Sequence, residues 1–142
     1  MVTSKQCFDK FGDPLTTNDE GTYMVMWDVP PTLEIGVIPK RLYCNKLMMQ
    51  PLTTAFSNLI SRNVVYELKT WDGCFNIRKK RGLASMSLHS WGLAIDVNAA
   101  WNGLGTESKL SPEFVKCFTD AGFHWGGEWS RKDPMHFQIS KI

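Results

Sequence analysis

The sequence predicts an α+β fold, with a few helices and a small antiparallel sheet. Apolar residues recur at helical spacing across residues 51–62. A serine followed by a proline and an acid marks the start of a second helix at Ser111. Residues 93–98 and 135–139 alternate apolar with small or polar side chains, which is typical of strands that bury one face. Helices and strands therefore share one short chain.

Length and composition indicate one globular domain. The chain has 142 residues, of which 43% are hydrophobic, and this is enough apolar material for a buried core. The net charge of +2 is too small to indicate nucleic-acid binding, which usually needs a clustered basic face. We expect a monomer with a single domain over residues 1–142, of which 1–45 form a loop-rich N-terminal part.

The first half of the chain is expected to hold one helix and two extended segments. Turn-forming residues dominate the first forty positions, so we expect loops there, with a short extended piece at Tyr23 to Trp27. The helix over Pro51 to Arg62 begins with a proline, which costs no hydrogen bond in a first turn. The β-branched and aromatic run Val64 to Leu68 then predicts a strand. Asp72-Gly73 predicts a turn, and a basic loop follows at residues 78–81.

The second half alternates strand, helix and strand. In the strand 93–98, period-2 alternation places Asp96 and Asn98 on the face opposite its large apolar residues. The helix that starts at Ser111 is expected to end at Gly122. In the strand 135–139, His136 and Gln138 share the polar face. Each strand thus presents polar side chains of a kind that can bind a ligand.

The chain shows no signal-peptide pattern and no apolar run long enough to span a membrane. We therefore expect synthesis in the cytoplasm without export by a signal of its own, and no stable membrane association. The four cysteines are widely scattered and form no Cys-x-x-Cys pair, so free thiols are favoured over disulfides or a cysteine zinc site: Cys7, Cys44, Cys74 and Cys117.

Two of the three histidines indicate a metal site. His89 precedes Asp96 by seven residues, with a glycine between them that allows a tight turn, and His136 lies on a second strand. If the two strands are neighbours, His89, Asp96 and His136 converge. Two imidazoles and a carboxylate leave a zinc coordination position open, as in catalytic sites. The alternatives are packed histidines without a metal, or an iron facial triad, which usually takes its first two ligands from a tighter spacing.

Hydrolysis at such a site also needs a general base. Asp133 lies three residues before His136, and the proline after it favours an extended backbone that fixes the direction of the carboxylate. Glu128 is the second candidate. The alternative for both is an acid exposed to solvent, and the spacing favours Asp133.

Two segments resemble the signatures of one enzyme family. Ser87-Leu-His89-Ser-Trp-Gly92-Leu-Ala94-Ile-Asp96 resembles the Ser-x-His-x-x-Gly-x-Ala-x-Asp motif of the D-alanyl-D-alanine carboxypeptidase and L-alanyl-D-glutamate endopeptidase family of zinc peptidases. Asp133-Pro-Met-His136 resembles its second motif, an acid three residues before the last zinc ligand. This family includes VanY-type carboxypeptidases and small phage endolysins, and it shares its fold with the hedgehog signalling domain.

The resemblance implies a role for each matching residue. His89, Asp96 and His136 would bind Zn²⁺, and Asp133 would be the general base. Arg78 would stabilise the substrate carbonyl or carboxylate, with Arg81 as the rival and a solvated basic loop as the alternative. Substrate contacts are expected from the serine of the first motif and from the glycine-tryptophan stretch before the second, unless these are turn and core residues: Ser87, Trp125, Glu128 and Trp129.

The implied substrate is the peptidoglycan stem peptide. VanY-type members carry glutamate where this chain has Asp133, and the aspartate is more similar to the phage endopeptidases. We therefore expect an L-alanyl-D-glutamate endopeptidase that acts as a phage endolysin and reaches the wall after the membrane is permeabilised. A D-alanyl-D-alanine carboxypeptidase and a non-catalytic zinc-containing binding module are the alternatives.

Overall fold

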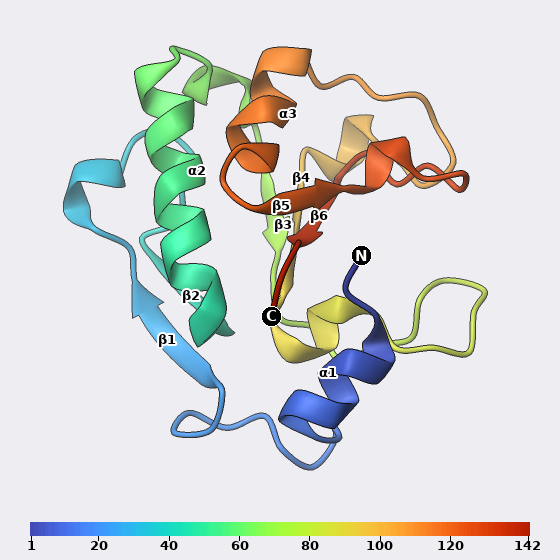
Figure 1. Ribbon diagram of the computed structural model, residues 1–142. Helices are drawn as coiled ribbons and strands as arrows, with labels where there is room; N and C mark the ends of the chain where they lie inside the picture. The colour runs from blue at the N-terminus through green and yellow to red at the C-terminus, as the bar shows by residue number, and fades with distance from the viewer.

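The computed structural model describes all residues, 1–142, and has three helices and two antiparallel sheets. This confirms the predicted α+β fold (Figure 1). The helices and strands follow one another in this order: α1 (Ser4–Phe11), β1 (Met24–Asp28), β2 (Arg41–Asn45), α2 (Met49–Ser61), β3 (Trp71–Gly73), β4 (Ala94–Val97), α3 (Pro112–Thr119), β5 (Phe123–Trp125) and β6 (His136–Ile139). None of the helices combines the length and apolar character that crossing a membrane requires.

The larger sheet has the strand order β3-β4-β6-β5, so β4 and β6 are its two central strands. They pair antiparallel, with Ile95 opposite Phe137 and Asp96 opposite His136. Helices α2 and α3 lie side by side against the sheet (Figure 1), and the Phe118 ring of α3 lies 4.7 Å from the ring of Phe137. Because side chains alternate along a strand, Asp96 and His136 face away from these helices.

The hydrophobic core joins the helices to the sheet and extends from Val2 to Ile139. Its largest fully buried side chains include Phe56, Phe114, Phe118 and Phe137. Complete burial of one such side chain contributes about 1.5–3 kcal/mol. All four cysteines are also buried and unpaired, which confirms the prediction of free thiols. Burial raises the pKa of Cys7 and of Cys44 to about 12, so both stay protonated at neutral pH.

The strand predicted at Val64 to Leu68 is wrong, because Val65–Glu67 forms a single 3-10 turn. The Asn98 side chain satisfies the backbone there instead of a neighbouring strand. Its Oδ1 accepts from the amides of Lys69 and Thr70, at 2.8 and 3.1 Å, and its Nδ2 donates to the carbonyl of Glu67 at 2.7 Å. A buried side-chain amide has therefore outweighed the local strand preference.

Helix α1 was not predicted, since only loops and short extended pieces were expected before residue 41. A capping box starts it: the Thr3 hydroxyl accepts from the amide of Gln6, and the Gln6 side chain accepts from the amide of Thr3. The helix packs on the segment that carries His89 through Phe8, whose ring lies edge-on to Trp91 at 4.9 Å. The extended piece expected at Tyr23 to Trp27 is present as β1.

Gly92 closes the tight turn between His89 and Asp96. Its φ is +65°, a left-handed conformation, and a Cβ placed there would lie 2.7 Å from the amide nitrogen of Asn45. That approach is closer than real Cβ contacts allow, so both the backbone angle and the packing require glycine.

We predict that Gly92→Ala destabilises the fold more than Gly36→Ala does. Gly36 has a similar φ of +61° with nothing within 4 Å of its Cβ position, so it isolates the backbone strain of about 1–2 kcal/mol. At Gly92 the clash with β2 adds about 1–3 kcal/mol. Urea unfolding of both variants measures the difference. If both variants lose the same free energy of unfolding, β2 shifts away from the added methyl group without a loss of stability.

Candidate metal centre

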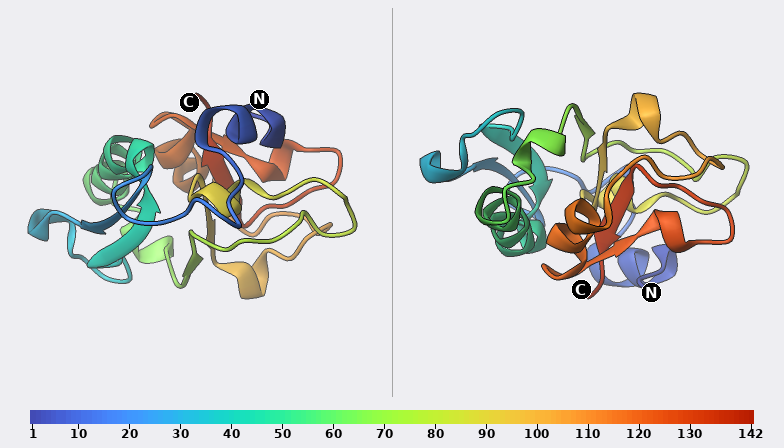
Figure 2. Two further views of the ribbon diagram at one scale, coloured as in Figure 1. Left: turned by 90° about the horizontal axis from the view of Figure 1, so that it is seen from below. Right: turned by 90° about the horizontal axis from the view of Figure 1, so that it is seen from above.

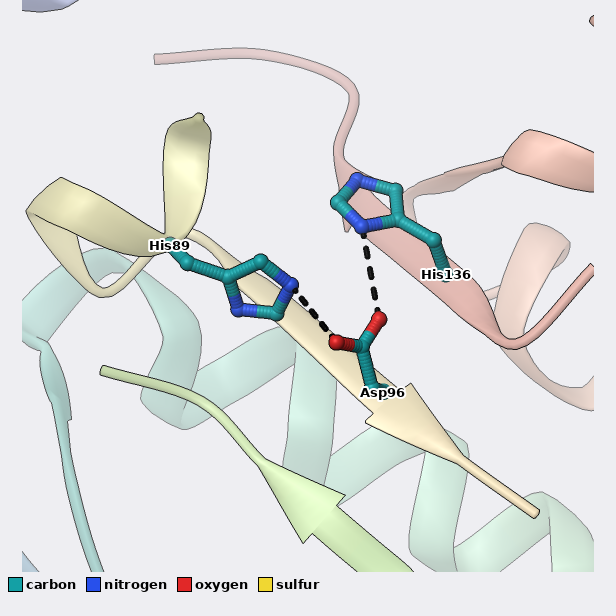
Figure 3. A group of neighbouring side chains, drawn as sticks. All are labelled: His89, Asp96 and His136. Atoms are coloured by element: carbon teal, nitrogen blue, oxygen red, sulfur yellow. Dashed lines mark ion pairs between the residues drawn. The ribbon is translucent and has the colours of Figure 1, made fainter. Parts of the chain in front are cut away.

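His89, Asp96 and His136 converge at the polar face of the sheet (Figure 3). His89 lies in a 3-10 turn, Leu88–Trp91, which leads into β4, while Asp96 and His136 are opposite one another on β4 and β6. One potential ligand atom from each residue lies within 4.8 Å of the other two. His89 Nε2 is 3.1 Å from Asp96 Oδ2, and His136 Nδ1 is 3.5 Å from Asp96 Oδ1.

The hydrogen bonds of the two rings decide which nitrogen each offers to a metal. His89 Nδ1 lies 2.7 Å from the carbonyl of Cys74, so Nδ1 carries the proton and the lone pair of Nε2 points into the centre. His136 Nε2 lies 3.0 Å from Gln138 Oε1, so His136 donates from Nε2 and offers Nδ1. Orientation of a ligating histidine through its second nitrogen is the usual arrangement in metal sites.

Burial leaves part of this donor set without a protein partner. His89 Nε2 and Asp96 Oδ1 are buried and make no hydrogen bond, and their only close polar contacts are those within the centre itself. An unsatisfied buried polar atom costs about 1–3 kcal/mol, and a bound cation removes that cost for both. Two imidazole nitrogens and a carboxylate with an open position fit a divalent metal of catalytic type. The residues present therefore fit the metal that the sequence predicts.

The electrostatics of Asp96 also suit a ligand. Burial opposes ionisation of this carboxyl, but the two neighbouring histidines, His136 and His89, outweigh burial and hold its pKa well below the usual range. Asp96 is therefore ionised at neutral pH. A metal ligand has to be in this state.

The centre opens onto a cavity of about 210 Å³, which several of the predicted site residues line: Arg78, Ser87, Asp96, Trp129, Asp133 and His136. Asp133 Oδ2 lies 4.0 Å from His136 Nδ1. Burial raises the pKa of Asp133; the charge of His136 opposes the rise, and that of Asp96 adds to it. The carboxylate is thus adjacent to the centre and binds a proton more readily than an exposed aspartate does.

A short turn holds Asp133 in place. Its amide donates to the carbonyl of Gly126 at 2.9 Å, and its carbonyl accepts from the amide of His136 at 3.0 Å. A Cβ at position 126 would lie 2.5 Å from the Asp133 carbonyl oxygen, so this approach requires glycine. Gly126 and His136, the two hydrogen-bond partners of Asp133, both lie in segments that the sequence predicts to belong to the site.

Arg78 lies near the Asp96 carboxylate, with Nη2 3.9 Å from Asp96 Oδ2. The fully buried Ser90 anchors its backbone: the hydroxyl accepts from the Arg78 amide at 3.1 Å and donates to the Arg78 carbonyl at 3.0 Å. The Ser87 amide donates to the same carbonyl, and the Ser87 hydroxyl accepts from the amide of His89, at 3.3 Å. Ser87 thus links the arginine to the first histidine.

The two predicted tryptophans occupy different places. The Trp129 ring lies 5.2 Å from that of His136 and lines the cavity. Trp125 and Glu128 line a second hollow beside α3, together with His124. The Trp125 indole donates to the carbonyl of Pro134 at 2.8 Å and stacks on Phe137. Trp125 therefore contacts the backbone next to Asp133 and lies outside the cavity.

Three contributors to the centre were not predicted as such: the Cys74 carbonyl, Ser90 and Gln138. The sequence does indicate that Gln138 lies near the centre, because strand alternation places it on the same polar face as His136. The other two gave none, because a buried backbone carbonyl or a serine hydroxyl acquires its role only through tertiary contacts between distant segments.

We predict that Gln138→Leu lowers the affinity for Zn²⁺ by about 10–100-fold, because the His136 ring loses the acceptor that fixes its orientation. Gln50→Leu, on helix α2, is the control, since the exposed Gln50 side chain hydrogen-bonds only to Thr54. Competition with a chromophoric chelator measures both affinities, and circular dichroism confirms folding. An affinity within twofold of the wild type would show that Gln138 does not orient the ring.

Comparison with known proteins agrees with this geometry. Residues 80–139 match the family described as D-alanyl-D-alanine carboxypeptidase, and the matched segment contains Asp133 and all three metal-binding residues. Neither the search of curated proteins nor that of solved structures gives a match. The part of the chain that is similar to the D-alanyl-D-alanine carboxypeptidase family, residues 80–139, therefore carries the whole His89–Asp96–His136 group.

Proposed function

We propose that the protein is a zinc-dependent peptidase of peptidoglycan that cleaves the stem peptide between L-alanine and D-glutamate. The observation that carries this proposal is the position of Asp133 and Arg78. Both line the cavity onto which the His89–Asp96–His136 group opens, one near His136 and the other near Asp96. Zinc-dependent peptide hydrolysis needs a metal-binding group, a general base and a cation that stabilises developing negative charge. All three are present at this one cavity.

Each residue has a role in this reaction. When bound, Zn²⁺ supplies Lewis-acid polarisation of the scissile carbonyl. Asp133 accepts a proton from the attacking water at its carboxylate and returns it to the leaving amine, so the acid ends the cycle unchanged. Its raised pKa supports this exchange. The Arg78 guanidinium stabilises negative charge on the substrate as the carbonyl carbon becomes tetrahedral.

The cavity chemistry suits a substrate with a carboxylate next to the scissile bond. When the bond between L-alanine and D-glutamate breaks, the leaving D-glutamate carries a free α-carboxylate, because its γ-carboxyl is the group that links to the next residue. In D-alanyl-D-alanine the leaving residue carries the terminal carboxylate. Arg78 suits either carboxylate. The aspartate at position 133, which resembles the phage endopeptidases, favours the first bond.

The D-alanyl-D-alanine carboxypeptidase is the second candidate, and the family description of residues 80–139 favours it. The third is a binding module that holds zinc without hydrolysis. The position of Asp133 argues against the module, since an acid 4.0 Å from His136 Nδ1 adds nothing to binding a metal that three other residues already ligate.

We propose in addition that the protein acts as a phage endolysin. The resemblance to small phage-borne members supports this role, in which a monomer made in the host cytoplasm reaches the wall once the membrane is permeabilised.

Digestion of purified peptidoglycan, with and without a chelator, tests the proposed function. We expect chelator-sensitive products that end in L-alanine or begin with D-glutamate, identified by mass. Release of terminal D-alanine alone would replace the endopeptidase with the carboxypeptidase. Zinc at one per chain without any cleavage would favour the binding module.

We predict that Asp133→Asn lowers kcat by about 10²–10⁴-fold while zinc stays bound at one per chain. Asparagine keeps the shape of the side chain and both backbone hydrogen bonds of the turn but accepts no proton. Asp28→Asn, whose side chain is exposed and pairs with Arg41, is the control and should keep full activity. Loss of zinc from the Asp133 variant, measured by elemental analysis, would make Asp133 a ligand and remove it as the base.

A further inference from the structure

The cavity carries more positive charge than the centre uses. Four cationic side chains line it, Arg78, Lys80, Arg81 and Arg131, against only two carboxylates, those of Asp96 and Asp133. Asp96 belongs to the metal-binding group, and Asp133 lies near His136 of the same group. Arg78 has Asp96 within ion-pair distance, whereas no carboxylate lies within 4.0 Å of the other three cations.

Two of these cations meet where two loops come together. The loop over residues 78–86 is a hairpin, closed by a bridge between Lys79 and Met86 and by the bond from the Lys80 amide to the Ser85 carbonyl, at 2.9 Å. The guanidinium of Arg131 donates to the Arg81 carbonyl. This loop and the segment around Arg131 extend from the same side of the molecule (Figure 2). Arg131 thereby joins the two edges of the cavity.

The geometry leaves the two guanidinium groups free to bind an anion. A guanidinium has five N–H donors, and the contact with a neutral carbonyl accounts for one of those of Arg131. The Arg81 side chain lines the same cavity as Asp133 and Arg131. The cavity therefore has two cationic positions, one at Arg78 beside Asp96 and another at Arg81 and Arg131.

We propose that Arg81 and Arg131 form a second carboxylate subsite, which binds a free carboxylate one residue beyond the leaving residue of the substrate. This inference rests on the proposed endopeptidase. Arg78 takes the α-carboxylate of D-glutamate, and the second subsite takes a side-chain carboxylate of the next residue. The substrate class is then a stem peptide with a diamino diacid such as meso-diaminopimelate at the third position, in preference to lysine, which lacks that carboxylate.

Two synthetic pentapeptides test the subsite: L-Ala-γ-D-Glu-meso-diaminopimelyl-D-Ala-D-Ala and its L-lysyl counterpart. Because a hydrogen-bonded charge pair is worth about a tenfold to hundredfold difference in binding, we expect kcat/KM of the zinc-loaded wild type to favour the diacid peptide by at least about tenfold. Arg81→Ala and Arg131→Ala should each reduce that preference, because KM for the diacid peptide rises more than KM for the lysyl peptide.

Lys132→Ala is the matched control, because it removes the same charge next to Arg131 from a side chain that pairs with Glu107 and does not line the cavity. It should keep the wild-type preference. Arg81→Ala retains the carbonyl that Arg131 contacts, so it separates anion binding from a purely structural tie between the loops. The subsite would be overturned if Arg131→Ala lowered kcat/KM equally for both peptides and Arg81→Ala had no effect. Arg131 would then serve only to hold the two loops together.

The products separate the failure of this inference from the failure of the proposed function. Equal cleavage of both peptides after L-alanine would overturn the subsite and leave the endopeptidase intact. Release of D-alanine alone would overturn both.

Discussion

The antiparallel pairing of β4 with β6 is the constraint on which the centre depends. Its register sets Asp96 directly opposite His136, and the same register places Ile95 and Phe137 together beneath the helices. A shift by one residue would turn the apolar residues to the cavity and the ligands into the core. Hydrophobic burial on one face of the sheet therefore fixes the metal-binding geometry on the other. No ligand position is independent of the core.

Beyond the sheet, the turn that carries His89 is held by two segments that precede it in the chain. The N-terminal helix packs on Trp91, and the Trp91 indole donates to the carbonyl of Gly12 at 2.9 Å. The buried Asn45 donates to the carbonyl of Trp91, and so ties β2 to the turn that carries His89. These contacts surround the first ligand with rigid neighbours, which is the support that a metal site needs to keep its geometry.

The sequence predicted the parts of the fold and site that depend on local periodicity. Alternation along β4 and β6 identified which face carries Asp96, His136 and Gln138, because side-chain direction in a strand follows from position alone. The strand expected at Val64 to Leu68 failed for the opposite reason. Its backbone partner is the side chain of Asn98, some thirty positions away, and no local pattern indicates such a contact. Similarly, nothing in the sequence distinguishes Trp125, outside the cavity, from Trp129, which lines it.

The bond between Gln138 and the carbonyl of Val2, at 3.4 Å, bears on the order in which the protein matures. Through this one amide, the orientation of the last metal-binding residue is coupled to the first strongly buried position of the chain. A nascent chain that has not yet produced β6 holds two of the three metal-binding residues and lacks the partner of β4. The complete metal-binding group therefore forms only after β6 has paired with β4, at the end of folding.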